Sequence, residues 1–117
     1  MPTSIPFDFV FDYLPMSITT RKLFGMHYIY FGERIMLILR LNKNQPELNG
    51  VWVATITKHH ESLQIIVPEL GGFIMDGKEQ HGNWLFIRDN EDDFEGAVIK
   101  VCELISRGDP RIGNVPK

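Results

Sequence analysis

Large apolar residues recur at helical spacing in three separate parts of the chain. The spacing i, i+3, i+4, i+7 places such residues on one side of a helix, where they can face a core. It predicts a short first helix, a middle helix and a last helix. The middle segment is also compatible with a strand, because residues 65–67 are consecutive β-branched residues, but we favour the helix. The three stripes are Phe7, Val10, Phe11 and Leu14; Leu63, Ile66, Val67 and Leu70; and Phe94, Val98, Val101 and Ile105, which Ala97 and Leu104 widen.

Residues beside these stripes predict where each helix begins and ends. Ser4 and Thr57 are suitable N-caps for the first and middle helices, because a hydroxyl oxygen can accept a hydrogen bond from the first turn. Pro15 should end the first helix, and Gly71–Gly72 should end the middle one. The last helix has the clearest ends: Asp89 or Asn90 as its cap, Glu91, Asp92 and Asp93 at the positive end of its dipole, and Arg107 followed by Gly108 at its other end.

Between residues 20 and 57 the pattern changes to an alternation of period two. β-Branched and aromatic residues are grouped between the turn-forming pairs Phe31–Gly32 and Asn49–Gly50, which predicts an antiparallel meander. Residues 42–50 are polar, contain Asn, Pro and Gly, and have no apolar period, so we expect a connecting loop. Residues 51–57 should form the next strand.

Alternation along residues 33–41 assigns a face of the sheet to each side chain. Two further short strands are expected near residues 73–76 and 84–88, joined through residues 77–82. In the 33–41 strand one face should carry Ile35, Leu37, Leu39 and Leu41, and the other Arg34, Met36, Ile38 and Arg40. We expect the first of these faces to be buried against the helices.

The resulting order of elements is α-β-β-β-β-α-β-β-α. It predicts an α+β fold in which an antiparallel sheet of about five to six strands packs against helices at the N-terminus, in the middle and at the C-terminus. Residues 1–117 should form a single domain, since no linker or repeat divides them. Residues 109–117 contain two Pro and one Gly and should be an extended tail.

Charge and composition exclude several classes of protein. The net charge of −3 and the pI near 5.7 are opposite to the basic footprint of most nucleic-acid binders. The single cysteine excludes an intramolecular disulfide, so a reducing cytoplasm is the expected location. The N-terminal segment does not resemble a signal peptide, and the longest apolar run, residues 35–39, is far too short to span a membrane.

No group of residues forms a recognised catalytic, metal or cofactor motif. Cys102 falls in the second half of the last helix, where the dipole raises a thiol pKa, so we expect an inert packing residue. The acidic cluster of residues 91–95 is explained by its place at a helix start. No serine or glycine motif for acyl or phosphate chemistry occurs. The four histidines, His27, His59, His60 and His81, have no spacing that lets two of them share a metal ion.

Aromatic and basic residues supply the candidate interaction surface. Two tyrosines should stand on one face of a strand, and two tryptophans could line a groove wherever the sheet is left uncovered. Core packing is the competing interpretation for all four aromatic residues. The candidate surface residues are Arg21, Lys22, Tyr28, Tyr30, Trp52 and Trp84.

Short motifs spread over the chain resemble the N-terminal domain of TfoX/Sxy-like competence regulators. They are residues 21–25 (RKLFG), residues 32–36 (GERIM), the pair Gly72–Phe73, and residues 84–88 (WLFIR) before an acidic helix start. The resemblance implies a compact α+β fold similar to YjbR-like proteins. It implies no known catalytic residues and a regulatory role. No cofactor is expected.

These observations lead to three functional hypotheses. The first is a non-enzymatic cytoplasmic interaction or regulatory module that presents a surface to a protein or small ligand. The second is weak nucleic-acid binding through the 21–40 hairpin, with Arg34 and Arg40 added to the candidate surface. The third is an enzyme in which His59 or His60 is a general base. A homodimer through an edge strand or the aromatic face is also open.

Overall fold

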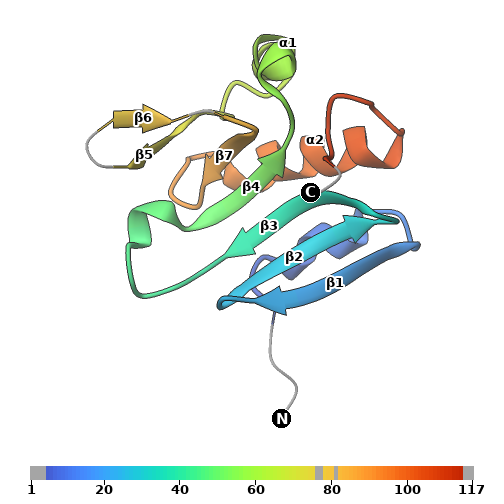
Figure 1. Ribbon diagram of the computed structural model, residues 1–117, viewed down its shortest axis with the longest axis horizontal. Helices are drawn as coiled ribbons and strands as arrows, with labels where there is room; N and C mark the ends of the chain where they lie inside the picture. Colours follow the sequence, from blue (N-terminus) through green and yellow to red (C-terminus); the bar gives the residue numbers. More distant parts are fainter. Residues whose placement is uncertain (1–4, 76–77, 81, 115–117) are drawn as a thin grey trace.

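The helices and strands follow one another in an order close to the predicted one. The computed structural model describes residues 5–75, 78–80 and 82–114. Figure 1 shows a mixed α+β domain, as predicted. Its elements are the 3₁₀ helix η1 (Asp8–Asp12), β1 (Ile18–Leu23), β2 (Met26–Phe31), β3 (Arg34–Arg40), η2 (Pro46–Leu48), β4 (Gly50–Ala54), η3 (Thr57–His59), α1 (His60–Ile66), β5 (Phe73–Met75), β6 (Lys78–Gln80), β7 (Trp84–Arg88) and α2 (Phe94–Ser106).

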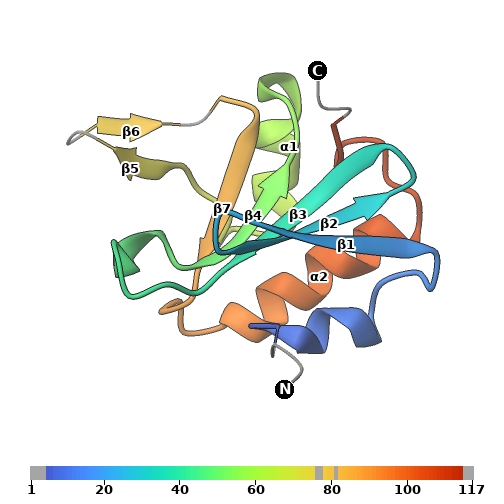
Figure 2. The same cartoon turned by 60° about the horizontal axis from the view of Figure 1, so that its bottom comes forward.

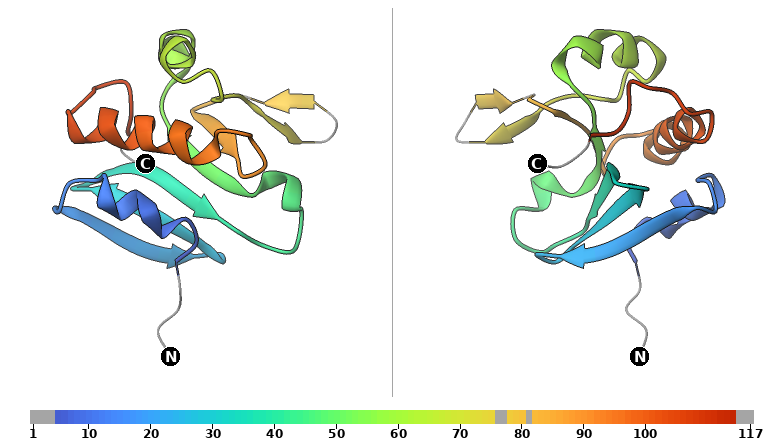
Figure 3. Two further views of the ribbon diagram at one scale, coloured as in Figure 1. Left: turned by 180° about the vertical axis from the view of Figure 1, so that it is seen from behind. Right: turned by 45° about the vertical axis from the view of Figure 1, so that its right-hand side comes forward.

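Five of the described strands form one antiparallel sheet in the order β1-β2-β3-β4-β7. Figures 2 and 3 show η1 and α2 on the same side of this sheet. We call that side the inner face and the opposite side the outer face. The chain leaves β4 through η3, α1 and the separate β5–β6 hairpin before it returns as β7. Strands that are neighbours in the sheet are therefore mostly neighbours in the sequence, as expected for a meander.

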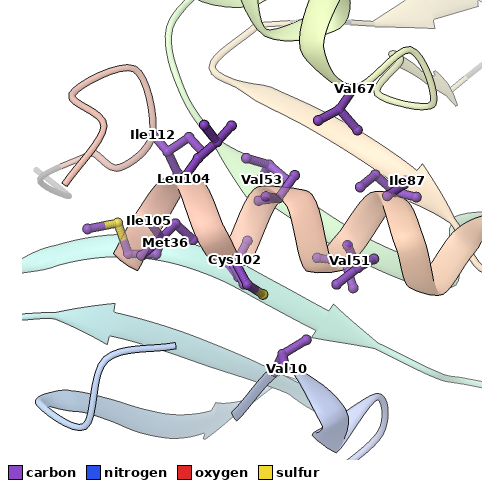
Figure 4. Close-up of a cluster of buried hydrophobic side chains, with 14 of the residues drawn as sticks. Val10, Met36, Val51, Val53, Val67, Ile87, Cys102, Leu104, Ile105 and Ile112 are labelled. Carbon is purple, nitrogen blue, oxygen red and sulfur yellow. The ribbon is translucent and has the colours of Figure 1, made fainter. Parts of the chain in front are cut away.

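The stripe predicted for the last helix is confirmed as the centre of the core. Every residue of that stripe is buried, and so is Cys102. Figure 4 shows α2 lying over aliphatic side chains of the sheet, among them Val51, Val53 and Ile87. Because these partners carry no polar atoms, burial against them is favourable without any hydrogen-bond requirement.

A β-bulge in β3 changes the predicted face of several residues. Ile29 pairs with Leu37, but the next residue of β2 pairs with Ile35, so Met36 is an extra residue in β3. Met36 and Leu37 both belong to the inner core, whereas Ile35 packs on the outer face. Leu41 lies beyond the strand and is 56% exposed. The predicted inner face was therefore right for Leu37 and Leu39 and wrong for Ile35 and Leu41.

The first helix is a five-residue 3₁₀ helix and not the longer α-helix that was predicted. Val10 and Leu14 are buried as expected. Phe7 and Phe9 make edge-to-face contacts with Phe94 of α2, with ring centroids 5.0 and 6.3 Å apart. Contact with α2, and not helical periodicity, therefore fixes these rings. The predicted cap Ser4 lies outside the described residues.

The middle helix is confirmed, but with different ends. It starts after η3 and stops at Ile66, and the Thr57 hydroxyl donates to the Gly82 carbonyl and does not cap it. Pro68 explains the early end, because the residue before a proline avoids helical backbone, and Val67 has φ −128° and ψ 86°, outside the helical region. The predicted strand 51–57 likewise ends at Ala54.

Gly50 belongs to a strand and not to the predicted turn at Asn49–Gly50. It is the first residue of β4 and pairs with Arg40 on one side and Arg88 on the other. Its φ is +148°, and a Cβ there would lie 2.1 Å from the Ile87 carbonyl oxygen. Only glycine allows this close approach of two strands. A two-residue turn that was not predicted, Phe24–Gly25, joins β1 to β2 with positive φ at both residues.

The strands predicted near residues 73–76 and 84–88 are present as β5 and β7. The segment expected to join them contains a further short strand, β6, which pairs with β5. Residues 76–77 and 81 of this segment lie outside the described residues.

The ends of the last helix are predicted correctly on one side only. Its N-cap is Asp93 and not Asp89 or Asn90, because the backbone first makes a turn in which Glu91 N–H donates to the Arg88 carbonyl. At the other end Gly108 has φ +75°, and its N–H donates to the Ile105 carbonyl. This is the glycine-terminated C-cap that the sequence predicted.

The described part of the predicted tail packs back onto the sheet. Ile112 is buried, the Gly113 N–H donates to the Ala54 carbonyl at 2.8 Å, and Asn114 forms an antiparallel bridge with Ile35. β4 ends at Ala54, and beyond that point the tail pairs with the start of β3 in its place. The prediction of an extended tail did not anticipate this packing of residues 112–114, which gives partners to backbone groups at that edge. Residues 115–117 lie outside the described residues.

Candidate ligand-binding groove

A row of side chains crosses the outer face of the sheet in register. Strand pairing aligns one residue from each of the five strands: Arg21, Tyr28, Ile38, Trp52 and Phe86. Since η1 and α2 both lie on the inner face (Figures 2 and 3), neither of them covers this row. The outer face is therefore where the sheet presents its aromatic residues.

A groove of about 400 Å³ lies on this face. Its apolar lining consists of Met26, Tyr28, Ile38, Leu48, Trp52 and Trp84. Arg40 and Gln45 supply polar lining, and Gln45 and Leu48 come from the loop between β3 and β4. The volume is within the range, roughly 300–1,000 Å³, of pockets that hold small molecules.

Trp52 is held in one orientation by two contacts. Its ring stacks on Phe86 with centroids 4.5 Å apart and an interplanar angle of 21°. Its indole Nε1–H donates to the Leu48 carbonyl at 3.1 Å. Both contacts fix the ring before any ligand arrives, so binding against it costs little side-chain entropy.

Arg40 organises the loop beside the groove. Its side chain is 9% exposed, and its Nη1 donates to the Gln45 carbonyl at 2.9 Å and to the Asn49 amide oxygen at 2.6 Å. Its Nη2 donates to the Asn44 carbonyl at 2.7 Å. All three acceptors are neutral oxygens. Among the described residues, Arg40 forms no ion pair with a carboxylate.

Asn49 ties the two ends of the same loop together. Its amide oxygen accepts from the Asn42 N–H at 2.9 Å, and its amide Nδ2 donates to the Asn42 carbonyl at 2.9 Å. Asn49 is buried, so these bonds are partly shielded from water. Sequence reasoning assigned residues 42–50 to a polar loop and missed this anchoring. The available signal was an arginine that ends an apolar strand just before a loop rich in asparagine.

The structure brings most of the predicted surface residues together and separates one. Tyr28, Trp52 and Trp84 line the groove, and Tyr30 packs in the same outer cluster. Arg21 is exposed and pairs with Tyr28 across the strands. Lys22 follows Arg21 in the strand and therefore lies on the opposite face, paired with His27.

Two titratable groups near these strands have shifted pKa values. Burial, with a smaller effect from Tyr30, raises the pKa of the Tyr28 phenol, which keeps it neutral and able to donate a hydrogen bond. Burial, followed by the nearby charge of Lys22, lowers the pKa of His27. His27 is 8% exposed, and its Nδ1 has no hydrogen-bond partner among the described residues.

The other candidate chemical groups do not meet at a common site. Cys102 is fully buried, as expected of a packing residue. The pKa of its thiol is raised to about 12, and the causes are burial and then Glu103. His59 and His60 are adjacent in the chain but not equally accessible, since His60 is buried and His59 is half-buried. In the part of the chain that the structure describes, no three His, Cys, Asp or Glu residues are grouped so that they could hold a metal ion.

Comparisons with protein-family models, with curated proteins and with solved structures find no match to this chain. The resemblance to TfoX/Sxy-like regulators therefore stays a prediction. No helix within the described residues has the length and apolar character needed to cross a membrane.

Proposed function

We propose that this chain is a non-enzymatic, cytoplasmic interaction or regulatory module that binds a ligand in the groove on the outer face. The observation that carries the proposal is a groove of about 400 Å³ whose walls include Trp52, Trp84 and Tyr28 on a face that η1 and α2 do not cover. Half-buried aromatic side chains that line a groove are typical of ligand-binding sites. The TfoX/Sxy-like motifs agree with a regulatory role.

The residues that line the groove support binding over catalysis. Among the described residues, the lining includes no Cys, His, Ser, Asp or Glu, which are the usual nucleophiles and general bases of enzymes. The raised pKa of the Tyr28 phenol makes it a poor base near neutral pH. His59 and His60 are not among the lining residues.

Nucleic-acid binding is less well supported than ligand binding. The Arg34 Nη2 donates to the Ile112 and Gly113 carbonyls, and Arg40 is only 9% exposed, so it presents little charge to an extended phosphate backbone. Lys22 lies on the other face of the strand from Tyr28. Of the basic residues considered for this role, Arg21 alone is exposed on the same face as the tyrosines. A single exposed cation contributes little to the binding of a phosphate backbone.

A neutral fluorescent probe tests whether the groove binds apolar molecules. We expect N-phenyl-1-naphthylamine to become fluorescent with the wild-type protein and to receive energy transfer from Trp52 and Trp84, the two tryptophans of the chain. Trp84→Ala should abolish most of this signal. Tyr13→Ala, which removes an exposed aromatic residue outside the groove, is the matched control and should keep it. An unchanged signal in Trp84→Ala would reject the groove as the binding surface.

A further inference from the structure

The polar groups that line the groove are mainly hydrogen-bond donors. The guanidinium of Arg40 has more N–H groups than its three hydrogen bonds use. The Tyr28 hydroxyl and the Trp84 indole N–H also have no partner within the described part of the chain. Donors without acceptors in a half-buried site favour a ligand that supplies acceptor oxygens.

The charge of Arg40 adds a preference for an anion. The side chain is nine-tenths buried, and its three acceptors are neutral. A buried cation without a counter-charge is costly, and an anion that reaches it recovers part of that cost. A carboxylate matches the planar fork of a guanidinium, because two parallel N–H groups can bind its two oxygens.

The strands of the sheet are positively charged although the whole chain is acidic, so they also favour an anion. None of the five strands β1, β2, β3, β4 and β7 contains an Asp or a Glu. Alternation and pairing place Arg21, Arg40 and Arg88 on the outer face. The net charge of −3 therefore arises from loops and helices, and the sheet around the groove is positive.

We infer that the groove binds a small carboxylic acid with an apolar body, and that the carboxylate pairs with Arg40 while the body lies against Trp52 and Trp84. This inference rests on the proposed function and names the class of ligand. The volume of about 400 Å³ is in the lower part of the range for ligand pockets, which fits a small molecule.

A matched pair of ligands tests the charge without changing the protein. We would titrate the wild-type protein at pH 7 with 4-phenylbutyrate and with its neutral amide, 4-phenylbutyramide. The readout is the shift of the two indole N–H signals in ¹H–¹⁵N NMR, which belong to Trp52 and Trp84. We expect the acid to bind at least about tenfold more tightly than the amide, as for hydrogen bonds to charged groups.

Variants then assign the preference to Arg40. Arg40→Met should remove the difference between acid and amide, and Arg40→Lys should keep part of it, because a point charge remains. Arg21→Met is the control, since Arg21 lies on the same face but does not line the groove; it should change the affinity less than about twofold. If Arg40→Met does not fold, Tyr28→Phe tests the same site. We expect it to lower the affinity for 4-phenylbutyrate about two- to tenfold.

Four results would overturn the inference. Equal affinities for the acid and the amide would remove the role of the charge, yet binding of the neutral naphthylamine probe would leave the proposed function intact. An equal loss in Arg21→Met and Arg40→Met would show a diffuse field and no pairing with Arg40. Binding of a peptide with a C-terminal phenylalanine, but not of phenylbutyrate, would point to a protein partner. Sedimentation that shows a dimer closing the groove would replace the small molecule by a second copy.

Discussion

The two faces of the sheet are built from alternate residues of the same strands, but they are packed differently. In β7, Leu85 and Ile87 point to the inner face and are fully buried, whereas Trp84 is half-buried at the groove. The inner face is mainly aliphatic, with His27 as a buried exception, and α2 packs against it. The outer face carries aromatic rings with N–H and O–H groups, and beside them the buried guanidinium of Arg40. The inner face therefore supplies stability, while the outer face keeps groups suited to recognition.

The largest expected effect comes from truncating neighbouring residues that point to opposite faces. Leu85→Ala should lower the free energy of unfolding by about 2–5 kcal/mol, because it leaves a cavity under α2. Trp84→Ala should cost less in stability and should abolish binding of the naphthylamine probe. Urea denaturation and probe fluorescence measure the two properties. If both variants lost stability equally, the division of roles between the faces would fail.

A smaller effect is expected from Arg40, which connects the groove to its loop. Arg40→Met should cost about 1–3 kcal/mol, because the Asn49 oxygen and two carbonyls lose their donors. Hydrogen exchange should quicken at the Asn42 N–H, which is bonded to the same Asn49 oxygen. Exchange in α2 should rise only through the global loss of stability. Unchanged exchange at Asn42 would show that Arg40 does not hold the loop.

The smallest expected effect is the pH dependence of folding stability that arises from His27 on the inner face. The pKa of His27 is lowered in the folded state, so the unfolded chain binds a proton more readily. The stability that neutral His27 provides is therefore complete above its unfolded pKa of about 6.5. It is lost as the pH falls from there through the lower, folded pKa. Urea midpoints measured between pH 8 and pH 5 should fall more steeply for the wild type than for His27→Leu.

Arg21→Met serves as the outer-face control for this titration. Arg21 is exposed and pairs with Tyr28, on the opposite face of the sheet from His27. Its variant should keep the slope of the wild type between pH 8 and pH 5. A wild-type slope in His27→Leu would assign the pH dependence to another group.

Much of the fold was predictable because its signals are local. The stripe of α2, its C-terminal Gly108 and the limits of β7 follow from residues that are close in sequence. Where prediction failed, a distant contact decided. The bulge at Met36 depends on pairing with β2, and the start of β4 at Gly50 depends on a close approach to β7.

The candidate site was predictable as a set of residue types but not as a shape. Tyr28 was singled out because it shares a strand face with Tyr30, and Trp52 and Trp84 because tryptophan is enriched at binding surfaces. Lys22 was included with them because it is next to Arg21 in the sequence. Strand alternation, however, places Lys22 on the opposite face of the sheet. Arg40 did not stand out as a groove residue, because its three acceptors lie in a loop without periodicity.

By itself the sequence determined the α+β class, the apolar stripe of α2 and the supply of aromatic and basic residues for the outer face. These depend on spacing and composition, which act over a few residues. The tertiary structure alone decided which face each β3 residue occupies, the return of residues 109–114 to the sheet, and the groove between Trp52, Trp84 and Arg40. Those features require strands and loops far apart in the chain to meet, and the free energy of such contacts is not encoded in any local pattern.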